Sequence, residues 1–144
     1  MTDIKITKTA SDEDLEKCFC IRKSVFVREQ NVSEAEEIDG LDSEADHYLL
    51  WVDGKATGTA RVRYLSDVAK IERVAVLNSM RGLALGQRLM EFIISDIQNN
   101  SPATLMKLGA QIHVIKFYEK LGFISYGDEF MDANISHKWM KRKI

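Results

Sequence analysis

Residues 74–94 read VAVLNSMRGLALGQRLMEFII, and this stretch decides the fold because it leads from a strand straight into a helix. Frequent β-branched residues predict a strand over 69–76, and the apolar spacing that follows predicts a helix over 81–99. One stripe of that helix carries the apolar side chains Leu85, Leu89, Phe92, Ile93 and Ile97. We therefore expect the helix to pack on a sheet that contains the strand.

The predicted first turn of this helix is rich in small residues and suits a phosphate group. Backbone N–H groups in the first turn of a helix have no partner within it, and the helix dipole adds about half a positive charge there. Main-chain donors can therefore hold a pyrophosphate, and Gly82, Ala84 and Gly86 would let it approach the backbone closely. Glycines at a helix start also occur for packing alone, so the spacing leaves both interpretations open.

Two common phosphate-binding motifs do not match this stretch. A dinucleotide fingerprint, G-x-G-x-x-G, follows the first strand of a parallel unit, whereas Gly82-x-x-x-Gly86 lies in mid-chain. A nucleoside triphosphatase loop ends in Gly-Lys-Ser or Gly-Lys-Thr, which the stretch lacks. If a phosphate binds here, the site belongs to another class.

Upstream, the pattern predicts a strand over 4–8 and a helix that Ser11 can cap and that runs to about Glu29. Residues 33–46 are strongly acidic and poor in core-forming side chains, which predicts a loop with a short helical turn. This acidic segment is either solvated surface or the border of a binding site.

The remaining elements complete a mixed sheet. Asp53-Gly54 separates two β-rich runs within 47–65 and predicts a hairpin. Further along, we expect a strand over 103–110, a helix over 114–123 with Gly122 as its left-handed cap, and strands near 123–127 and 135–141. Helices separated by a mostly antiparallel meander indicate a sheet covered on both faces, α/β in broad class and α+β in detail. We expect one domain over residues 1–144.

Composition excludes several classes of protein. The apolar share of 45% and charged share of 29% are typical of a soluble globular protein, and no apolar run approaches the roughly 20 residues that span a bilayer. A net charge of −2 with scattered basic residues argues against a nucleic-acid partner. Acidic residues near the start, instead of a basic segment before an apolar one, argue against export, so we expect a cytoplasmic protein without a membrane role.

The two cysteines, Cys18 and Cys20, lie two positions apart in a predicted helix. Their side chains then point about 200° apart, which rules out a shared metal ion or an easy mutual disulfide. We expect free thiols and no metal site.

Two motifs also resemble the blocks of the GNAT superfamily of N-acetyltransferases, in the family's order and separation. The first is V-A-V-x-x-x-x-R-G-x-A-x-G-x-x-L over 74–89, and the more specific second is A-Q-x-H-x-x-x-F-Y-E-K-L-G-F over 110–123. The run VFVREQ over 25–30, with Glu37 and Asp39, is similar to a bacterial subgroup of small GNAT proteins. The resemblance covers most of the chain.

This resemblance implies an N-acetyltransferase that uses acetyl-coenzyme A, on a mostly antiparallel sheet of about six or seven strands with about four helices on its two faces. In the family, the acyl-binding strand has a bulge and splays from its neighbour, which leaves backbone groups for the pantetheine arm. The resemblance assigns to the cofactor Val74, Ala75, Val76, Arg81, Gly82, Leu83, Ala84, Leu85, Gly86, Gln87, Gln111 and Phe117. Ala84 replaces a usual glycine, and its methyl group would crowd the phosphate if this position has a positive φ.

Glu72 is our first choice for a general base. Acetyl transfer needs a neutral amine, and an ammonium of pKa about 10.4 costs about 4 to 5 kcal/mol to deprotonate at pH 7. A carboxylate on the strand that leads to the cofactor would help. With regular alternation Glu72 shares a face with Val74 and Val76, although a bulge would break that parity. The alternative is that Glu72 pairs with Arg73 or another surface cation.

Tyr118 aligns with the tyrosine that serves as general acid in many GNAT enzymes. With reference pKa values of about 10 for tyrosine and 8.5 for a thiol, its phenol stays protonated at neutral pH and can donate to the departing sulfur. The alternative role is packing in the core with the hydroxyl at the edge.

The acceptor is expected to be a small-molecule or peptide amine whose identity the sequence leaves open. The predicted acceptor-site residues are Phe26, Gln30, Asp39, His113 and His137. A second hypothesis is that the acidic side chains of Glu36, Glu37, Asp39 and Asp42 attract a cationic amine. Exposed final strands are compatible with a homodimer. The alternative to an enzyme is a noncatalytic coenzyme A-binding sensor or interaction module on the same fold.

Overall fold

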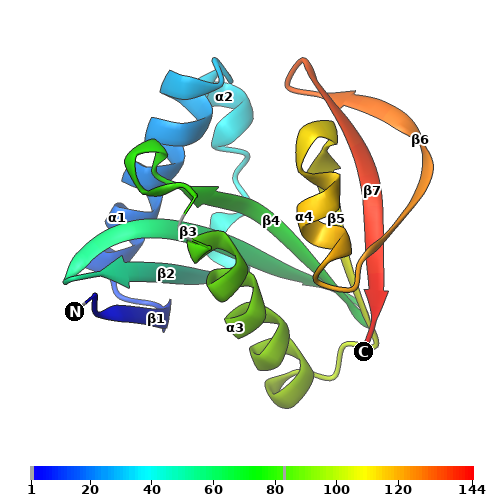
Figure 1. Ribbon diagram of the computed structural model, residues 1–144, viewed down its shortest axis with the longest axis horizontal. Helices are drawn as coiled ribbons and strands as arrows, with labels where there is room; N and C mark the ends of the chain where they lie inside the picture. The colour runs from blue at the N-terminus through cyan, green and yellow to red at the C-terminus, as the bar shows by residue number, and fades with distance from the viewer. Residues whose placement is uncertain (1, 83) are drawn as a thin grey trace.

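Within residues 2–82 and 84–144, the part of the chain that the computed structural model describes, seven strands form one sheet (Figure 1). Their order across the sheet is β1-β2-β3-β4-β5-β7-β6. The strands are β1 (Ile4–Thr9), β2 (Asp46–Val52), β3 (Lys55–Leu65), β4 (Val68–Val76), β5 (Leu105–Gln111), β6 (Ile124–Asp132) and β7 (Ile135–Lys143). Strands β4 and β5 run parallel and the other neighbours run antiparallel, which confirms the mixed, mostly antiparallel sheet.

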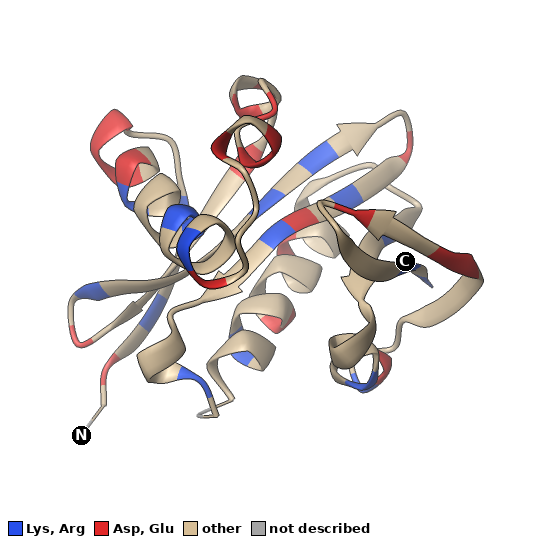
Figure 2. Ribbon diagram, turned by 90° about the horizontal axis from the view of Figure 1, so that it is seen from above, with Lys and Arg blue, Asp and Glu red and all other residues tan. Residues whose placement is uncertain are grey.

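Helices cover both faces of this sheet (Figures 1 and 2). They are α1 (Asp12–Arg22), the π-helix η1 (Lys23–Glu29), α2 (Glu34–Glu37), α3 (Leu85–Asn100) and α4 (Ile115–Glu119), with 3-10 turns η2 (Asp42–Glu44), η3 (Asn78–Met80) and η4 (Ile112–Val114). We call the face under α3 and α4 the back face and the face under α1 the front face. None of the helices described is both long and apolar enough to cross a membrane.

The larger core lies between α3 and the back face. The buried side chains of α3 are Leu85, Leu89, Met90, Ile93, Ile94 and Ile97. Each such side chain removed from water contributes about 1.5–3 kcal/mol, so this stripe anchors α3 beneath β4. Phe92, which the sequence places on the same stripe, is 38% exposed and meets Tyr48 edge to face at the border of the core.

The first residue of α3 corrects the predicted start of this helix at Arg81. Arg81 has an extended backbone, and Gly82 and Ala84 have φ values of +84° and +58°. Residues with a left-handed backbone cannot continue a right-handed helix, so the helix begins only at Leu85. Of the small residues that the sequence places inside the first turn, Gly82 and Ala84 therefore form the approach to it, and Gly86 remains within it.

The first helix begins and ends where the sequence predicts. The Oγ of Ser11 accepts a hydrogen bond of 3.2 Å from the N–H of Asp14, which confirms the predicted cap. Beyond Arg22 the last seven residues are wound as the π-helix η1, which ends at Glu29. Such wide turns are rare and occur frequently at functional sites.

Two turns also follow the predicted chemistry. Asp53 and Gly54 join β2 to β3 with φ values of +49° and +81°, as a two-residue hairpin of type I′ requires. After α4, Gly122 has a φ of +90°, and the N–H of Phe123 donates to the carbonyl of Tyr118 over 3.1 Å. This is the left-handed helix end that the sequence predicts. Strand β6 continues past an irregularity between Tyr126 and Phe130 and is longer than predicted.

Candidate active site

Strands β4 and β5 part in the middle of the sheet and open a cleft. They pair only from Val68 to Lys70 on β4 and from Leu105 to Lys107 on β5. Beyond this point the edge of β4 that faces β5 makes no ladder hydrogen bonds with it, and a cleft of about 830 Å³ lies there. Strand edges with unpaired polar groups need other partners, so this edge is prepared to bind an extended ligand.

The cleft gathers nearly all of the predicted site residues. Its lining includes Phe26, Gln30, Glu72, Val74, Ala75, Val76, Arg81, Gly82, Ala84, Leu85, Gly86, Gln87, Gln111, His113, Phe117, Tyr118 and His137. Asp39 does not line it and instead binds Arg61, with 2.8 Å between Oδ2 and Nη2. Leu83 lies outside the described residues. Segments that are far apart in the sequence thus meet at one opening.

At the back of the cleft, the first turn of α3 presents main-chain donors that no described side chain caps. The cap residue Ala84 offers no side-chain hydrogen bond, and the first turn contains no acidic side chain. A β-carbon on Gly86 would lie 3.4 Å from Cζ of Phe117, so the glycine lets α4 approach. The left-handed backbone of Ala84 costs about 1–2 kcal/mol for a non-glycine residue. The positive φ at which the sequence predicts crowding by this methyl group is therefore present.

Arg81 links the approach to α3 with the end of the first helix. Its guanidinium makes two hydrogen bonds to the carboxylate of Glu29, one of them 2.7 Å from Nη2 to Oε1. Its Nε donates to the carbonyl of Val76 over 3.0 Å. The hydrogen bonds from Arg81 hold the pKa of Glu29 below its usual value. The sequence does not predict this pair, because 52 residues separate its members.

A second contact closes the mouth of the cleft. The side-chain amides of Gln30 and Gln111 bond reciprocally, with donor–acceptor distances of 2.9 Å and 3.4 Å. Consecutive residues at the end of η1, Glu29 and Gln30, therefore contact both walls of the cleft, one near β4 and the other at the tip of β5.

Tyr118 stands on α4 with its ring in the core and lines the cleft. Its ring meets Phe117 and Phe123 edge to face, at centroid distances of 5.0 Å and 6.1 Å. Burial raises the pKa of the Tyr118 phenol well above its ordinary value, so the phenol is protonated throughout the neutral range.

A β-bulge in β4 controls which residues face the cleft from each side. Arg73 has a φ of +56°, and Arg73 and Val74 together oppose the single residue Ala60. Because the bulge adds one residue, Val74 packs with the back-face core whereas Ala75 belongs to the front-face core. Glu72, on the front side of the bulge, therefore does not share a face with Val74, and the regular alternation considered from the sequence is wrong.

Glu72 is surrounded by cations on the front face. Arg63 Nε lies 2.6 Å from Oε1 of Glu72, Arg61 Nε lies 3.2 Å from the same oxygen, and Lys70 Nζ lies 3.3 Å from Oε2. Burial alone would raise the pKa of Glu72, but the hydrogen bond from Arg63 and the charges of Arg61 and Lys70 outweigh it, so the pKa lies below its usual value. The carboxylate is ionised at neutral pH, and its pairing is with these side chains and not with Arg73.

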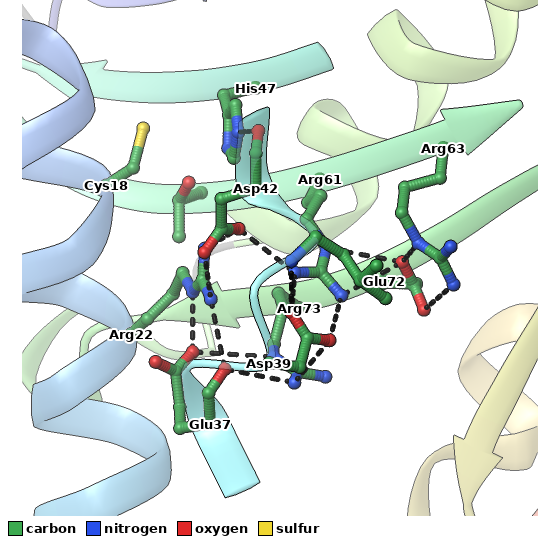
Figure 3. Close-up of polar contacts among 12 residues, drawn as sticks. Cys18, Arg22, Glu37, Asp39, Asp42, His47, Arg61, Arg63, Glu72 and Arg73 are labelled. Carbon is green, nitrogen blue, oxygen red and sulfur yellow. Dashed lines mark hydrogen bonds and ion pairs between the residues drawn. The ribbon is translucent and has the colours of Figure 1, made fainter. Parts of the chain in front are cut away.

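Glu72 belongs to a larger ion network that fixes the acidic segment 33–46 onto the front face (Figure 3). Its cations are Arg22, Arg61, Arg63, Lys70 and Arg73, and its carboxylates are Glu37, Asp39, Asp42 and Glu72. Arg22 and Arg61 are fully buried, with 1% and 0% of their surface exposed. Within the acidic segment, the carboxylates of Glu37, Asp39 and Asp42 are therefore paired with guanidinium groups, whereas Glu34, Glu36 and Glu44 lie on the exposed surface.

Aromatic rings line one wall of the cleft. Phe130 stacks with Trp139 at 4.8 Å and with His137 at 5.6 Å between ring centroids. Gly109 on β5 makes room for them, since a β-carbon there would lie 3.3 Å from Trp139 and 3.4 Å from Phe130. Nδ1 of the buried His137 lies 2.7 Å from the carbonyl oxygen of Ile135, whereas His113 is exposed at the rim.

Comparisons of sequence and of structure both find relatives described as acetyltransferases or acyltransferases. A family model described as an acetyltransferase (GNAT) domain matches residues 6–144. The uncharacterized N-acetyltransferase YjcF of Bacillus subtilis is 33% identical over 140 residues, which cover 96% of this chain and 99% of that protein. The crystal structure of Escherichia coli ElaA has a TM-score of 0.85 at 29% identity and covers 99% of this chain and 100% of its own. An acyl-CoA N-acyltransferase from Pseudomonas aeruginosa has a TM-score of 0.85 at 27% identity, with 97% and 99% of the two chains covered.

Proposed function

The chain belongs to the GNAT acetyltransferase family, and we propose that it transfers an acetyl group from acetyl-coenzyme A to a primary amine by direct attack on the thioester. The observation that carries this proposal is the parting of β4 and β5 beside the uncapped N-terminus of α3. An unpaired strand edge can pair with the amides of a pantetheine arm, and free helix N–H groups can hold its pyrophosphate.

The residues present fit such a cofactor. The first turn of α3, from Leu85 to Gln87, offers main-chain donors without a competing acidic side chain. The edge of β4 from Val74 to Val76 lies next to it along the same cleft. Bound acetyl-coenzyme A would supply the thioester whose carbonyl carbon accepts the amine. The protein holds this ligand, excludes water, donates a proton to the departing sulfur and accepts one from the acceptor nitrogen.

We assign to Tyr118 the proton that the departing sulfur receives. As the nitrogen–carbon bond forms, the carbon–sulfur bond breaks and the thiolate needs one proton. The buried phenol of Tyr118 is protonated at neutral pH and lines the cleft, which suits this donation.

We assign to Glu72 the proton that the acceptor nitrogen loses, which reaches it directly or through water. Glu72 is ionised and lines the cleft, as a base must be. The hydrogen bonds that Glu72 accepts from Arg61 and Arg63 make it a weak base. Its main contribution is therefore to orient the ammonium group of the acceptor before this group loses its proton.

Calorimetry with coenzyme A and a thiol-release assay over a panel of amines test this proposal. We expect coenzyme A to bind and to stabilise the fold by about 2.7 kcal/mol at 100 times its dissociation constant. We also expect thiol release to require both acetyl-coenzyme A and an amine. Binding without release for every amine would favour a noncatalytic coenzyme A-binding module, and absence of binding to the folded protein would overturn the proposal.

A further inference from the structure

Two lysines stand side by side where the cleft begins. Lys70 and Lys107 are register partners at the last paired position of β4 and β5, immediately before the strands part. Both ammonium groups lie over the ring of Trp139, at 5.3 Å and 4.3 Å from its centroid; Lys70 and Trp139 line the cleft, and Lys107 lies beside its end. They are therefore on the front face, at the point where β4 and β5 part, which we call the fork. This face is the acceptor side of the cleft.

Cations outnumber carboxylates in the ion network next to this position. The ion network around Glu72 holds five cations and four carboxylates, which leaves one positive charge unmatched. Lys107 adds a second, because no carboxylate lies within ion-pair distance of it among residues 2–82 and 84–144. Arg63 and Lys70 share the carboxylate of Glu72, and Lys107 lies beside Lys70 at the fork. An anionic group bound there would complete the charge balance.

The order of charges on the floor of the cleft matches one class of amine. Glu72 and Lys70 present a carboxylate and an ammonium 3.3 Å apart. An α-amino acid presents an ammonium and a carboxylate one carbon apart, in the complementary order. Its amine would then face Glu72 while its carboxylate faces Lys70 and Lys107, and charge-assisted hydrogen bonds of this kind are the strong ones.

The remaining wall is suited to an apolar body. The stacked rings of Phe130 and Trp139 stand beside the two lysines, and His137 continues the stack. An aromatic or branched side chain on the acceptor can pack against this surface at the same time as its carboxylate reaches the fork.

We infer that the acceptor is an α-amino acid or a similar amine with a neighbouring carboxylate, that Lys70 and Lys107 bind this carboxylate, and that the Phe130–Trp139 stack holds the side chain. The inference rests on the proposed acetyl transfer and names its acceptor class. It differs from the hypothesis of a purely cationic amine attracted by the acidic segment, in which Glu37, Asp39 and Asp42 are paired with arginines and Glu36 is exposed at the cleft.

Binding of product analogues tests this inference without depending on turnover. Calorimetry in the presence of coenzyme A would compare N-acetylphenylalanine with its neutral amide. We expect the carboxylate to bind at least tenfold tighter than the amide, and this ratio to fall as the salt concentration rises. In Lys70→Gln and Lys107→Gln the ratio should fall severalfold, mainly because the carboxylate binds less tightly. Equal affinities in the unaltered protein, or a ratio that both variants retain, would overturn the inference.

Lys55→Gln is the matched control. Lys55 is an exposed lysine at the start of β3, in the β2–β3 hairpin, and it neither lines the cleft as Lys70 does nor lies over Trp139 as Lys107 does. This variant should keep the full ratio.

A second experiment measures turnover. It compares phenylalanine, phenylalaninamide and phenethylamine by thiol release, and we expect the highest kcat/KM for phenylalanine. If no amine releases thiol while the binding ratio stands, acetyl transfer fails and the carboxylate site survives. If amines react but the carboxylate gives no advantage, the inference alone fails.

Discussion

Arg61 and Glu72 are register partners across β3 and β4, and the Nε of Arg61 lies 3.2 Å from Oε1 of Glu72. Arg61 is completely buried and also bonds Asp39 and Asp42, so a single guanidinium joins the acidic segment to the strand that borders the cleft. The position of Glu72 in the site thus depends on the ion network.

Substitution of Arg61 by alanine should destabilise the fold by about 3–5 kcal/mol, because carboxylates in low-dielectric surroundings would lose their partner. Urea unfolding monitored by circular dichroism measures the change. Arg88→Ala is the control, since Arg88 is exposed on α3 and its loss should alter the free energy of unfolding by no more than about 0.5 kcal/mol. A similar small effect for both variants would show that the network contributes little.

Acid should unfold the protein through the same carboxylates. Hydrogen bonds from Arg61 lower the pKa of Asp39, and for Asp42 burial is outweighed by the hydrogen bonds from Arg22 and Arg61, so the pKa also lies below its usual value. Groups with a lowered folded pKa stabilise the fold above their unfolded pKa of about 4, and this contribution is lost as the pH falls through the folded value. We expect the free energy of unfolding to be nearly constant from about pH 7 to 5 and to fall below about pH 4. A rise on acidification would contradict this assignment.

Replacement of Glu29 by glutamine should strengthen the binding of coenzyme A about two- to fivefold. Glu29 occupies the guanidinium of Arg81 and places a negative charge close to the donors of α3. The pair is partly exposed, which limits the effect to roughly 1 kcal/mol or less. Calorimetry at low and high salt measures it, with Glu91→Gln on the exposed side of α3 as control. Weaker binding in Glu29→Gln would mean that the carboxylate helps to hold the ligand.

Tyr118→Phe should lower kcat about 10²- to 10⁴-fold and leave the dissociation constant of coenzyme A within about twofold. The phenyl ring keeps the packing against Phe117 and Phe123, so the fold should persist. Tyr64→Phe, at the far end of β3, is the control and should keep full kcat. Because burial raises the pKa of Tyr118, activity of the unaltered enzyme should show no loss near pH 10 from its ionisation. Full turnover by Tyr118→Phe would assign the proton to another donor.

Local chemistry accounts for what the sequence predicts correctly. The cap at Ser11, the turn at Asp53-Gly54 and the helix end at Gly122 each depend on neighbouring residues, so a short window contains the information. The order of the two motifs likewise brings β4, α3 and α4 to one cleft, as the resemblance implies.

Features that depend on distant residues were not predictable in the same way. The resemblance implies a bulge in β4, but its position at Arg73 arises from the pairing of β4 with β3, and nothing in the local sequence marks a positive φ there. The contacts of Glu29 with Arg81 and of Gln30 with Gln111 join residues 52 and 81 positions apart. One signal was available: Arg61 in a β-rich run must be paired if that strand is central, because an isolated buried charge is too costly.

The π-helix η1 makes the mouth of the cleft sensitive to chain length. A π-turn accommodates one more residue than an α-turn over the same rise, and each residue turns a helix by about 100°. Deletion of one residue between Lys23 and Glu29 would therefore let the helix relax to regular winding and keep Glu29 and Gln30 close to their partners, whereas deletion of a second residue would rotate both away. Among homologues, the number of residues in this segment should therefore predict whether side-chain contacts join the two walls of the cleft.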